Sequence, residues 1–240
     1  MIITSTQNKQ IKDLLKLHNK KERDFYEMFL VEGEHLVECS IESGSLISLV
    51  VLDSYETKYD YPKITVSSNV MKKLSKQVTI PNVIGICKKN SECYIKGNVL
   101  LLDDIQDPGN LGTIIRSCLA FDIQTIILSP NSVDVYNDKV IRSSEGSIFK
   151  LNYIVEDLKS MINELKKDDY NILASVVTGG VKPVKMTSKY ALIMGNEGKG
   201  INKELTLLAD QLITIKMNEQ VESLNVGVAT GILLYELNKE

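Results

Sequence analysis

The chain has 240 residues, of which 43% are hydrophobic and 25% are charged, and its formal net charge is −3 at pH 7. These values are ordinary for a globular protein, and the length allows one large domain or two small ones. The longest nearly apolar segment, residues 226–234, is far shorter than the ~20 residues of a membrane span. The sequence shows neither a secretory segment nor a Cys/His cluster at zinc spacing. We therefore expect a cytoplasmic, metal-free protein with four reduced cysteines: Cys39, Cys87, Cys93 and Cys118.

The first 24 residues predict a polar leading helix over about 5–24, with its apolar side chains on one side: Ile11, Leu14, Leu15 and Leu17. Six basic residues stand against three acidic ones in this segment, although the whole chain is acidic. A solvated helix face would explain this composition. Composition alone favours this simpler interpretation, and a local nucleic-acid contact is the alternative, because phosphate binding needs basic density only at the interface.

Apolar runs alternate with amphipathic segments over residues 28–89, which predicts a small α/β unit. We expect strands near 28–32, 45–53, 63–68 and 82–89, and helices near 34–43 and 69–77. The polar stretch 88–98 that follows contains a glycine and marks a domain boundary. The predicted domains are therefore residues 1–95 and 96–240.

The alternation is cleaner after residue 98. Apolar strands are expected at 99–104, 125–129, 171–177, 190–194 and 212–217, with another over 147–154. Helices are expected at 110–122, 156–167, after residue 202 and over 223–239. This order predicts a parallel sheet covered on both faces. Ligands of such sheets bind at the carboxyl ends of the strands, so the loops 103–112, 177–183, 195–201 and 217–225 should form one composite pocket.

The first of these loops leads into "DPGNLGTIIRSC" (107–118). Pro108 and Gly109 indicate a turn, and Asn110 is well suited to cap the following helix. Arg116 falls beyond the edge of the apolar stripe of this helix, one turn after Gly112. An arginine here invites a reason specific to guanidinium, because the chain has only three arginines. A capped helix with one solvated arginine is the simpler alternative.

Two further loops carry small and polar residues. "GNEGKG" (195–200) matches neither the phosphate-loop spacing nor GxGxxG, and it places Glu197 directly beyond a strand. Ser223, with Asn225 two residues on, is the expected start of the last helix, whose small residues would allow very close packing: Gly227, Ala229, Thr230 and Gly231. A simple turn and an ordinary docking helix are the alternative interpretations.

Together and in this order, "DPGNLGTIIR", "GNEGKG" and "ESLNV" resemble the SpoU/TrmH group of the SPOUT methyltransferases, which methylate the 2′-oxygen of ribose in tRNA or rRNA. The stretches 139–149 and 29–44 are also similar to that family, so the resemblance covers nearly the whole chain. It implies an α/β fold: a C-terminal parallel-sheet domain with a deep trefoil knot, and a small N-terminal domain similar to an RNA-binding ribosomal protein.

The resemblance also implies S-adenosylmethionine as the cofactor, a homodimer whose active sites draw on two subunits, and no metal. The cofactor contacts would be Thr178, Gly179, Gly195, Asn196, Ile215, Met217, Ser223 and Leu224. The glycines of "GNEGKG" would let the backbone approach the cofactor, where a Cβ would obstruct it. The residues expected to carry the reaction are Arg116, Asn110, Glu197 and Asn225. We expect Arg116 to bind a substrate phosphate, because guanidinium is an unlikely general base on its own.

The predicted RNA contacts are Lys9, Lys12, Lys20, Lys21, Arg23 and Arg142, although Arg142 could instead meet the partner subunit or form a structural ion pair. Two residues depart from the family's usual form: Lys216 stands for a proline and Glu219 for a glycine. The N-terminal domain favours rRNA over tRNA as substrate. A non-catalytic RNA-binding or ribosome-assembly protein is the main alternative, and a small-molecule enzyme would leave the N-terminal domain unexplained.

Overall fold

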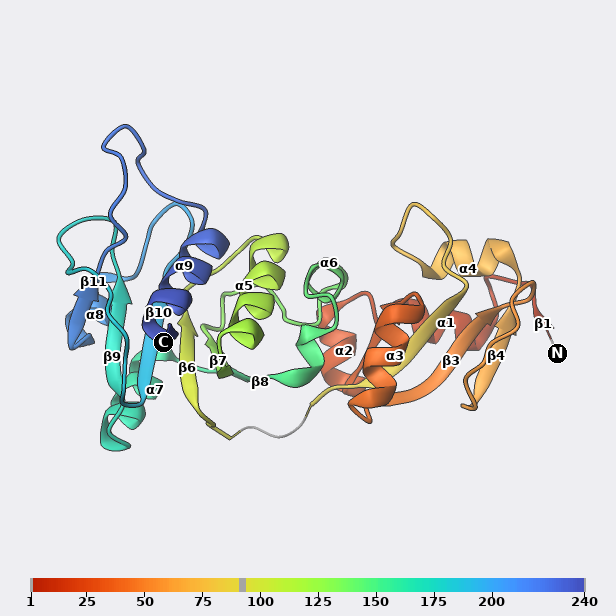
Figure 1. Cartoon of the computed structure of the whole chain (residues 1–240). Helices are drawn as coiled ribbons and strands as arrows, with labels where there is room; N and C mark the ends of the chain where they lie inside the picture. The colour runs from red at the N-terminus through yellow and green to blue at the C-terminus, as the bar shows by residue number, and fades with distance from the viewer. Residues whose placement is uncertain (1, 91–93, 240) are drawn as a thin grey trace. The chain divides into compact units, whose positions relative to one another are not determined.

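The computed structural model describes residues 2–90 and 94–239 and divides the chain into two compact units (Figure 1). Unit 1 comprises residues 1–91 and 136–149, and unit 2 comprises residues 92–135 and 150–240. The segment 136–149, which we expected in the second domain (96–240), therefore belongs to unit 1. The Phe29 ring packs against the rings of Tyr136 and Phe149, with centroid distances of 4.7 and 6.0 Å. Cys93 lies outside the described residues.

Unit 1 is built on a five-stranded mixed sheet with the strand order β1-β4-β3-β5-β2. The strands are β1 (Ile2–Ile3), β2 (Met28–Glu32), β3 (Leu46–Leu52), β4 (Lys63–Val66) and β5 (Val83–Lys88). The helices are α1 (Lys9–Lys16), α2 (Lys20–Tyr26), α3 (Glu34–Glu42), α4 (Ser68–Leu74) and α6 (Asp138–Ser143). Ile11 of α1 and Met71 of α4 are fully buried in one cluster with Val50 of the sheet, so α1 and α4 cover the same face.

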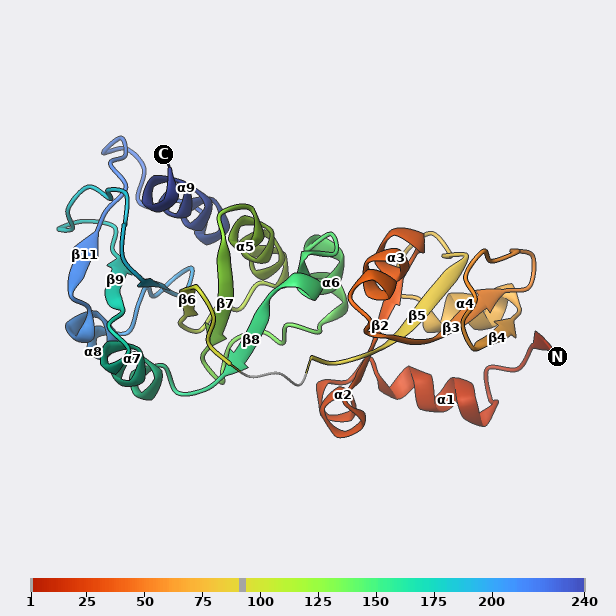
Figure 2. The same ribbon diagram turned by 60° about the horizontal axis from the view of Figure 1, so that its bottom comes forward.

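The single helix expected over 5–24 is two helices, α1 and α2, which Figure 2 shows as separate. The second helix begins after Asn19, whose side-chain oxygen accepts a hydrogen bond from the backbone N–H of Lys21 at 2.9 Å. Asparagine is among the best N-cap residues, because its side chain satisfies a backbone donor that the first helical turn leaves unpaired. Ile11 and Leu17 are buried as expected.

Unit 2 contains a six-stranded sheet in which every pair of neighbours is parallel, in the order β11-β9-β10-β6-β7-β8. The strands are β6 (Asn98–Leu102), β7 (Ile123–Leu128), β8 (Asn152–Val155), β9 (Asn171–Ser175), β10 (Tyr190–Met194) and β11 (Gln211–Ile213). The parallel sheet is therefore confirmed. β10 is buried at all five positions, as expected for a central strand covered on both faces. The trefoil knot stays a prediction.

Helices cover both faces of this sheet. They are α5 (Pro108–Ala120), α7 (Leu158–Lys167), α8 (Lys203–Leu208) and α9 (Val226–Asn238), and Figure 2 shows α5 and α9 on one side and α7 and α8 on the other. The small residues of α9 face α5: a Cβ on Gly227 would lie 3.1 Å from Thr113 Cγ2, and one on Gly231 would lie 3.4 Å from Ser117 Oγ. Close packing within the chain thus explains Gly227, whereas a Cβ on Gly231 would make an ordinary contact.

The expected strand over 147–154 is a 3₁₀ helix, η1 (Ser147–Lys150), followed by β8. Within residues 2–90 and 94–239, no helix has both the length and the apolar character needed to cross a membrane. The same residues include no group of three or more His, Cys, Asp or Glu side chains that could hold a metal ion.

Candidate functional site

A cavity of about 310 Å³ opens where β9 and β10 end. Its size lies at the lower end of the range of small-molecule sites. Six of the eight predicted cofactor contacts line it: Gly195, Asn196, Ile215, Met217, Ser223 and Leu224. Glu197, Val226 and Ala229 line it as well. The loops after three neighbouring strands thus converge with the start of α9 on one pocket, as expected for the carboxyl edge of a parallel sheet.

Thr178 and Gly179 do not line this cavity, and Ser175, Val176 and Val177 take their place. The chain turns away after Val177, because Gly179 has a left-handed φ of +82° and Gly180 donates its backbone N–H to Thr214 Oγ1 at 2.9 Å. A cofactor contact at Thr178 and Gly179 therefore stays a prediction, and the residues of this loop that line the cavity are the three before them. Lys216 and Glu219, the two departures from the family's form, are exposed and do not line the cavity either.

The loop 195–201 is closed tightly on itself. Asn196 and Gly200 exchange backbone hydrogen bonds at 3.1 and 2.9 Å, and the Asn196 side chain donates to the carbonyl of Asp104 at 2.8 Å. A Cβ on Gly195 would lie 2.3 Å from the Gly200 carbonyl carbon and from the Ile201 nitrogen. Gly195 is thus required by the backbone of its own loop, whereas the sequence interpretation attributed the glycine to the approach of a cofactor.

Three of the residues predicted to carry the reaction form a hydrogen-bonded chain. The Asn110 side chain donates to Glu197 Oε1 at 3.0 Å and accepts from the Asn225 side chain at 2.9 Å. Asn225 in turn accepts the backbone N–H of Gly227 at 2.9 Å, which makes it the N-cap of α9. This network joins the start of α5 to the loop 195–201 and the start of α9. Only the latter two line the cavity, so the loop 103–112, expected as part of the composite pocket, supports it from behind through Asn110.

The caps of α5 and α9 differ from the predicted ones. Asp107 caps α5 and accepts the backbone N–H of Asn110 at 2.8 Å, while Asn225 takes the place expected for Ser223. Because Asp107 satisfies the helix start, the Asn110 side chain is available to bridge Glu197 and Asn225. Sequence reasoning missed Asp107, although an acidic residue directly before a proline at the first helical position is a recognisable N-cap signal.

The carboxylate of Glu197 is held in its charged form. Partial burial by itself would raise the pKa of Glu197, but hydrogen bonds from the Asn110 side chain and from the backbone N–H groups of Glu197, Asp107 and Gln106 outweigh it. The pKa therefore lies below its ordinary value of 4.5. A charged carboxylate can only accept hydrogen bonds, so it fixes the direction of the network.

Replacing Glu197 with glutamine should change how stability depends on pH. A lowered pKa in the folded chain means that the unfolded chain binds the proton more readily, so Glu197 stabilises the fold above about pH 4.5 and loses this effect as the pH falls through the lowered pKa. Thermal unfolding of the wild type and of Glu197→Gln should give midpoints that differ at neutral pH and converge in acid. A difference that stays constant with pH would contradict a charge-selective role for this carboxylate.

Arg116 is exposed on α5, two turns beyond Asn110, and it is not among the residues that line the cavity. No hydrogen bond or ion pair holds its guanidinium to any other residue that the structure describes. The fourth residue predicted to carry the reaction is thus available for a ligand, but one copy of the chain does not bring it to the pocket.

The predicted RNA contacts in unit 1 divide into two groups. Lys9, Lys12, Lys20 and Lys21 are exposed. Arg23 is only 5% exposed, and its Nη1 donates to the carbonyl of Leu17 at 2.9 Å. Arg23 therefore anchors the junction between α1 and α2, and the structure contradicts its assignment as an RNA contact.

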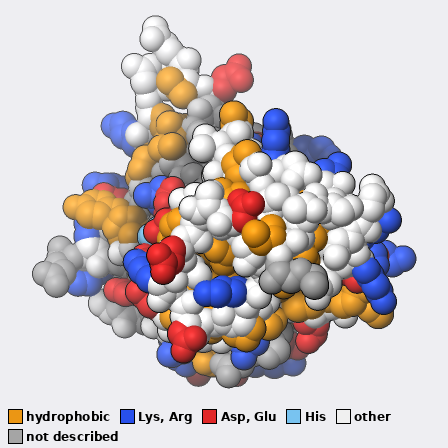
Figure 3. All heavy atoms as spheres, turned by 90° about the vertical axis from the view of Figure 1, so that its right-hand side faces the viewer, with side chains coloured by type: hydrophobic (Ala, Val, Ile, Leu, Met, Phe, Trp, Pro, Cys, Tyr) orange, Lys and Arg blue, Asp and Glu red, His pale blue; other side chains and the backbone are white. Residues whose placement is uncertain are grey.

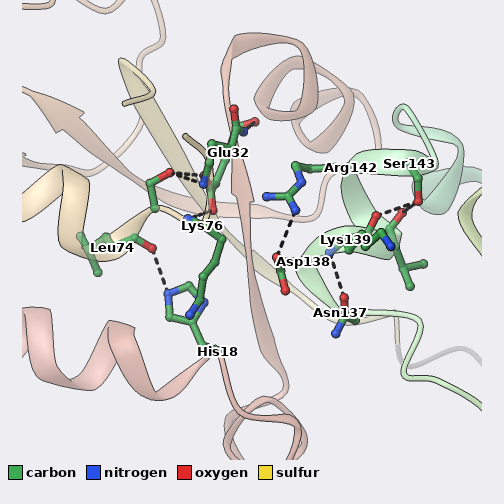
Figure 4. Close-up of polar contacts among 12 residues, drawn as sticks. His18, Glu32, Leu74, Lys76, Asn137, Asp138, Lys139, Arg142 and Ser143 are labelled. Carbon is green, nitrogen blue, oxygen red and sulfur yellow. Dashed lines mark hydrogen bonds and ion pairs between the residues drawn. The ribbon is translucent and has the colours of Figure 1, made fainter. Parts of the chain in front are cut away.

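Arg142 lies on α6 in unit 1 and pairs with Asp138 one turn earlier, at 3.4 Å (Figure 4). Both side chains are partly exposed, so this ion pair contributes little to stability and does not exclude a contact with RNA.

Figure 4 also shows His18, whose Nε2 is 2.9 Å from the Leu74 carbonyl. Burial and the nearby charge of Lys76 lower the pKa of His18, so the ring is neutral near pH 7. On the face in Figure 3, basic and acidic side chains are interspersed.

Comparison with known proteins agrees with this geometry. Residues 97–235 match the SpoU rRNA Methylase family, and residues 8–85 match the MRM3-like substrate binding domain. The chain is 33% identical over 244 residues to 23S rRNA (guanosine(2553)-2'-O)-methyltransferase RlmP of Bacillus subtilis, with 98% of each chain covered. It is 30% identical to the uncharacterized tRNA/rRNA methyltransferase slr1673 of Synechocystis, covering 99% of this chain and 93% of that one.

The fold is also similar to that of solved structures. The AdoMet-bound rRNA methyltransferase from Sinorhizobium meliloti has a TM-score of 0.87 and 27% sequence identity to this chain, covering 98% of this chain and 96% of that one. A crystal structure described as an RNA 2'-O ribose methyltransferase has a TM-score of 0.82 and 26% identity. Both similarities extend over the two units together.

Proposed function

Because the chain belongs to the SpoU rRNA methylase family, we propose that it transfers a methyl group from S-adenosylmethionine to a ribose 2′-hydroxyl of ribosomal RNA. The observation that carries this proposal is the cavity at the carboxyl edge of the unit 2 sheet, lined by six of the eight predicted cofactor contacts. The relative RlmP, named for a guanosine of 23S rRNA, supports rRNA over tRNA as the substrate.

The cavity is suited to S-adenosylmethionine on the chemistry of its walls. Ile215, Met217 and Leu224 provide apolar surface, while the loop 195–200 provides backbone groups and the charged residue Glu197. Such a mixture fits a ligand with a flat apolar base and a charged amino-acid end. When bound, the cofactor would supply a methyl group whose carbon a ribose oxygen can attack, while the bond from that carbon to the positively charged sulfur breaks and a neutral thioether leaves.

The chain's own residues would prepare the ribose for this attack. The 2′-hydroxyl is a poor nucleophile and must lose its proton as its oxygen forms the new bond to carbon. We assign Arg116 to binding an RNA phosphate, because a guanidinium stays protonated and grips phosphate through two parallel hydrogen bonds. Positioning the hydroxyl in this way supplies much of the acceleration. Asn110, Glu197 and Asn225 would keep the pocket in shape.

Methyl transfer from labelled S-adenosylmethionine to unmodified rRNA and tRNA pools, followed by nucleoside mass spectrometry, tests the proposal. A 2′-O-methylated nucleoside in the rRNA pool is the expected result. Transfer to tRNA alone would replace the substrate. Confirmed cofactor binding without transfer to either pool would favour the non-catalytic RNA-binding alternative.

We further propose that unit 1 binds the RNA and that the active chain is a cytoplasmic homodimer. The match of residues 8–85 to a substrate binding domain supports the first part. Two observations support the dimer. Arg116 does not line the cavity of its own chain, and α9 exposes an apolar stripe at helical spacing, with Val228 50%, Ile232 38% and Tyr235 55% exposed.

Replacing Ile232 with glutamate should therefore convert the dimer into a monomer, because a charge at the centre of an apolar interface is costly to bury without a partner. Sedimentation of the two proteins at equal concentration measures this change. Leu207→Glu is a matched control, since Leu207 is 84% exposed on α8 rather than on α9, and it should stay dimeric. A wild type that sediments as a monomer, or a dimeric Ile232→Glu variant, would contradict this interface.

A further inference from the structure

Phe25 and Tyr26 form an exposed aromatic pair on α2. Phe25 is 77% exposed and Tyr26 is 40% exposed, and their rings meet edge to face with centroids 4.9 Å apart. Phe29, another of the four phenylalanines in the chain, is only 1% exposed. An aromatic ring left so far in solvent buries little of its own surface, so packing of unit 1 does not account for it.

The fold holds this pair in place and directs Phe25 away from unit 1. Arg23 is the buried residue of α2, and its bond to the Leu17 carbonyl fixes the inner side of the helix. Phe25 follows two residues later, which is about 200° around the helix and nearly opposite Arg23. The N-cap at Asn19 fixes the start of α2. The ring is therefore presented on a short helix that is anchored from its opposite side.

The residues around the pair carry both signs of charge, with Glu22 in α2 and Glu27 at its C-cap, and the free positive charge comes from lysines of α1 and α2. Two of the three acidic residues in the first 24, Asp13 and Asp24, pair with Lys16 at 2.8 Å and with Lys89 at 2.6 Å. Four exposed lysines on α1 and α2 have no such partner among the residues described: Lys9, Lys12, Lys20 and Lys21. Lys21 lies one helical turn before Phe25, so a cation and an aromatic ring share one face of α2.

We propose that Phe25, supported by Tyr26, is a stacking platform for an unpaired base of the substrate RNA, and that the neighbouring lysines bind the flanking phosphates. Exposed aromatic rings beside cations are the usual means of holding single-stranded bases. A protein partner fits less well, because two rings between charged residues offer an apolar area far smaller than the ~800 Å² that each partner buries in a stable interface. This inference rests on the proposed RNA-binding role of unit 1.

The test measures binding of the full chain to an unmodified, in-vitro-transcribed 23S rRNA by filter retention over a range of salt concentrations. Phe25→Ala should weaken binding by about 5- to 150-fold, the equivalent of ~1–3 kcal/mol for one stacked base. The slope of log affinity against log salt should not change, because no phosphate contact is lost. Phe25→Trp keeps an aromatic ring at this position, so it should bind RNA about as tightly as the wild type. By contrast, Lys21→Ala should reduce the slope by about 0.7 to 0.9.

Controls separate this inference from the proposed function. Ile47→Ala removes another exposed apolar side chain of unit 1 (Ile47 is 42% exposed) and should bind as the wild type does. If the wild type binds RNA and transfers methyl groups but Phe25→Ala equals it, the stacking platform is wrong and the function stands. If Phe25→Ala changes the sedimentation of the chain, the pair is a protein contact. A wild type that neither binds nor methylates RNA overturns both.

Discussion

Replacing Arg116 with alanine is expected to lower the rate of methyl transfer by about 10²-fold or more while leaving the affinity for S-adenosylmethionine unchanged. The guanidinium is exposed, lacks a partner among the described residues and does not line the cavity. Its loss should therefore remove a contact with RNA and not one with the cofactor. Single-turnover transfer to rRNA and calorimetric titration with the cofactor measure the two quantities separately.

Two variants sharpen this prediction. Arg116→Lys keeps the positive charge but not the planar pair of donors, so its rate should lie between those of the wild type and the alanine variant. Lys203→Ala removes an exposed cation from α8 and should transfer at the wild-type rate. Full turnover by Arg116→Ala would refute the assigned role.

Replacing Gly195 with alanine is expected to lower the affinity for S-adenosylmethionine by about 10²-fold or more, because the loop that lines the pocket cannot keep its shape. The new Cβ would lie 2.3 Å from the backbone of Gly200 and Ile201, and such an overlap with backbone forces the loop to open. The two hydrogen bonds between Asn196 and Gly200 would be lost with it. Titration with the cofactor measures the loss.

Gly198→Ala is the matched control within the same loop. A Cβ there would meet only Asn196 Oδ1, at 3.7 Å, which is an ordinary contact. This variant should retain far more affinity than Gly195→Ala, although Gly198 also lines the cavity. Equal losses of affinity in the two variants would mean that the cofactor tolerates no side chain at either position. The tight closure of the loop would then not explain why Gly195 is needed.

The same two variants test whether an active site is shared between two chains. In a mixed dimer of Arg116→Ala and Gly195→Ala, one site receives an intact pocket from the first chain and an intact Arg116 from the second. Mixing two inactive proteins should then restore part of the activity. A site built from a single chain would show no recovery.

The elements of unit 2 and the convergence of its loops follow from local pattern. Apolar runs such as "YALIM" predict buried strands, and alternation with helices predicts a parallel sheet. Because the carboxyl ends of parallel strands meet at one edge, Asn110, Glu197 and Asn225 could be expected together from their places after strands or at helix starts. The structure joins these three residues by hydrogen bonds.

Other features depend on contacts between residues far apart in the chain, which no local pattern encodes. Arg23 looks like its exposed lysine neighbours in the sequence, but it is buried against the carbonyl of Leu17. Arg142 belongs to a segment, 136–149, that packs with unit 1 although the chain places it between strands of unit 2.

The sequence by itself thus determined the class of fold and the main strands along the chain, which follow from periodicity. Its short motifs indicated the family, and the resemblance named seven of the sixteen residues that line the pocket. Only the tertiary structure decided that Val177 and not Thr178 lines the cavity, that Asp107 frees Asn110 for the network, and that Gly195 is needed by its own loop. Each of these depends on the path of the backbone in space, where a turn of one residue or an approach of 2.3 Å decides the outcome.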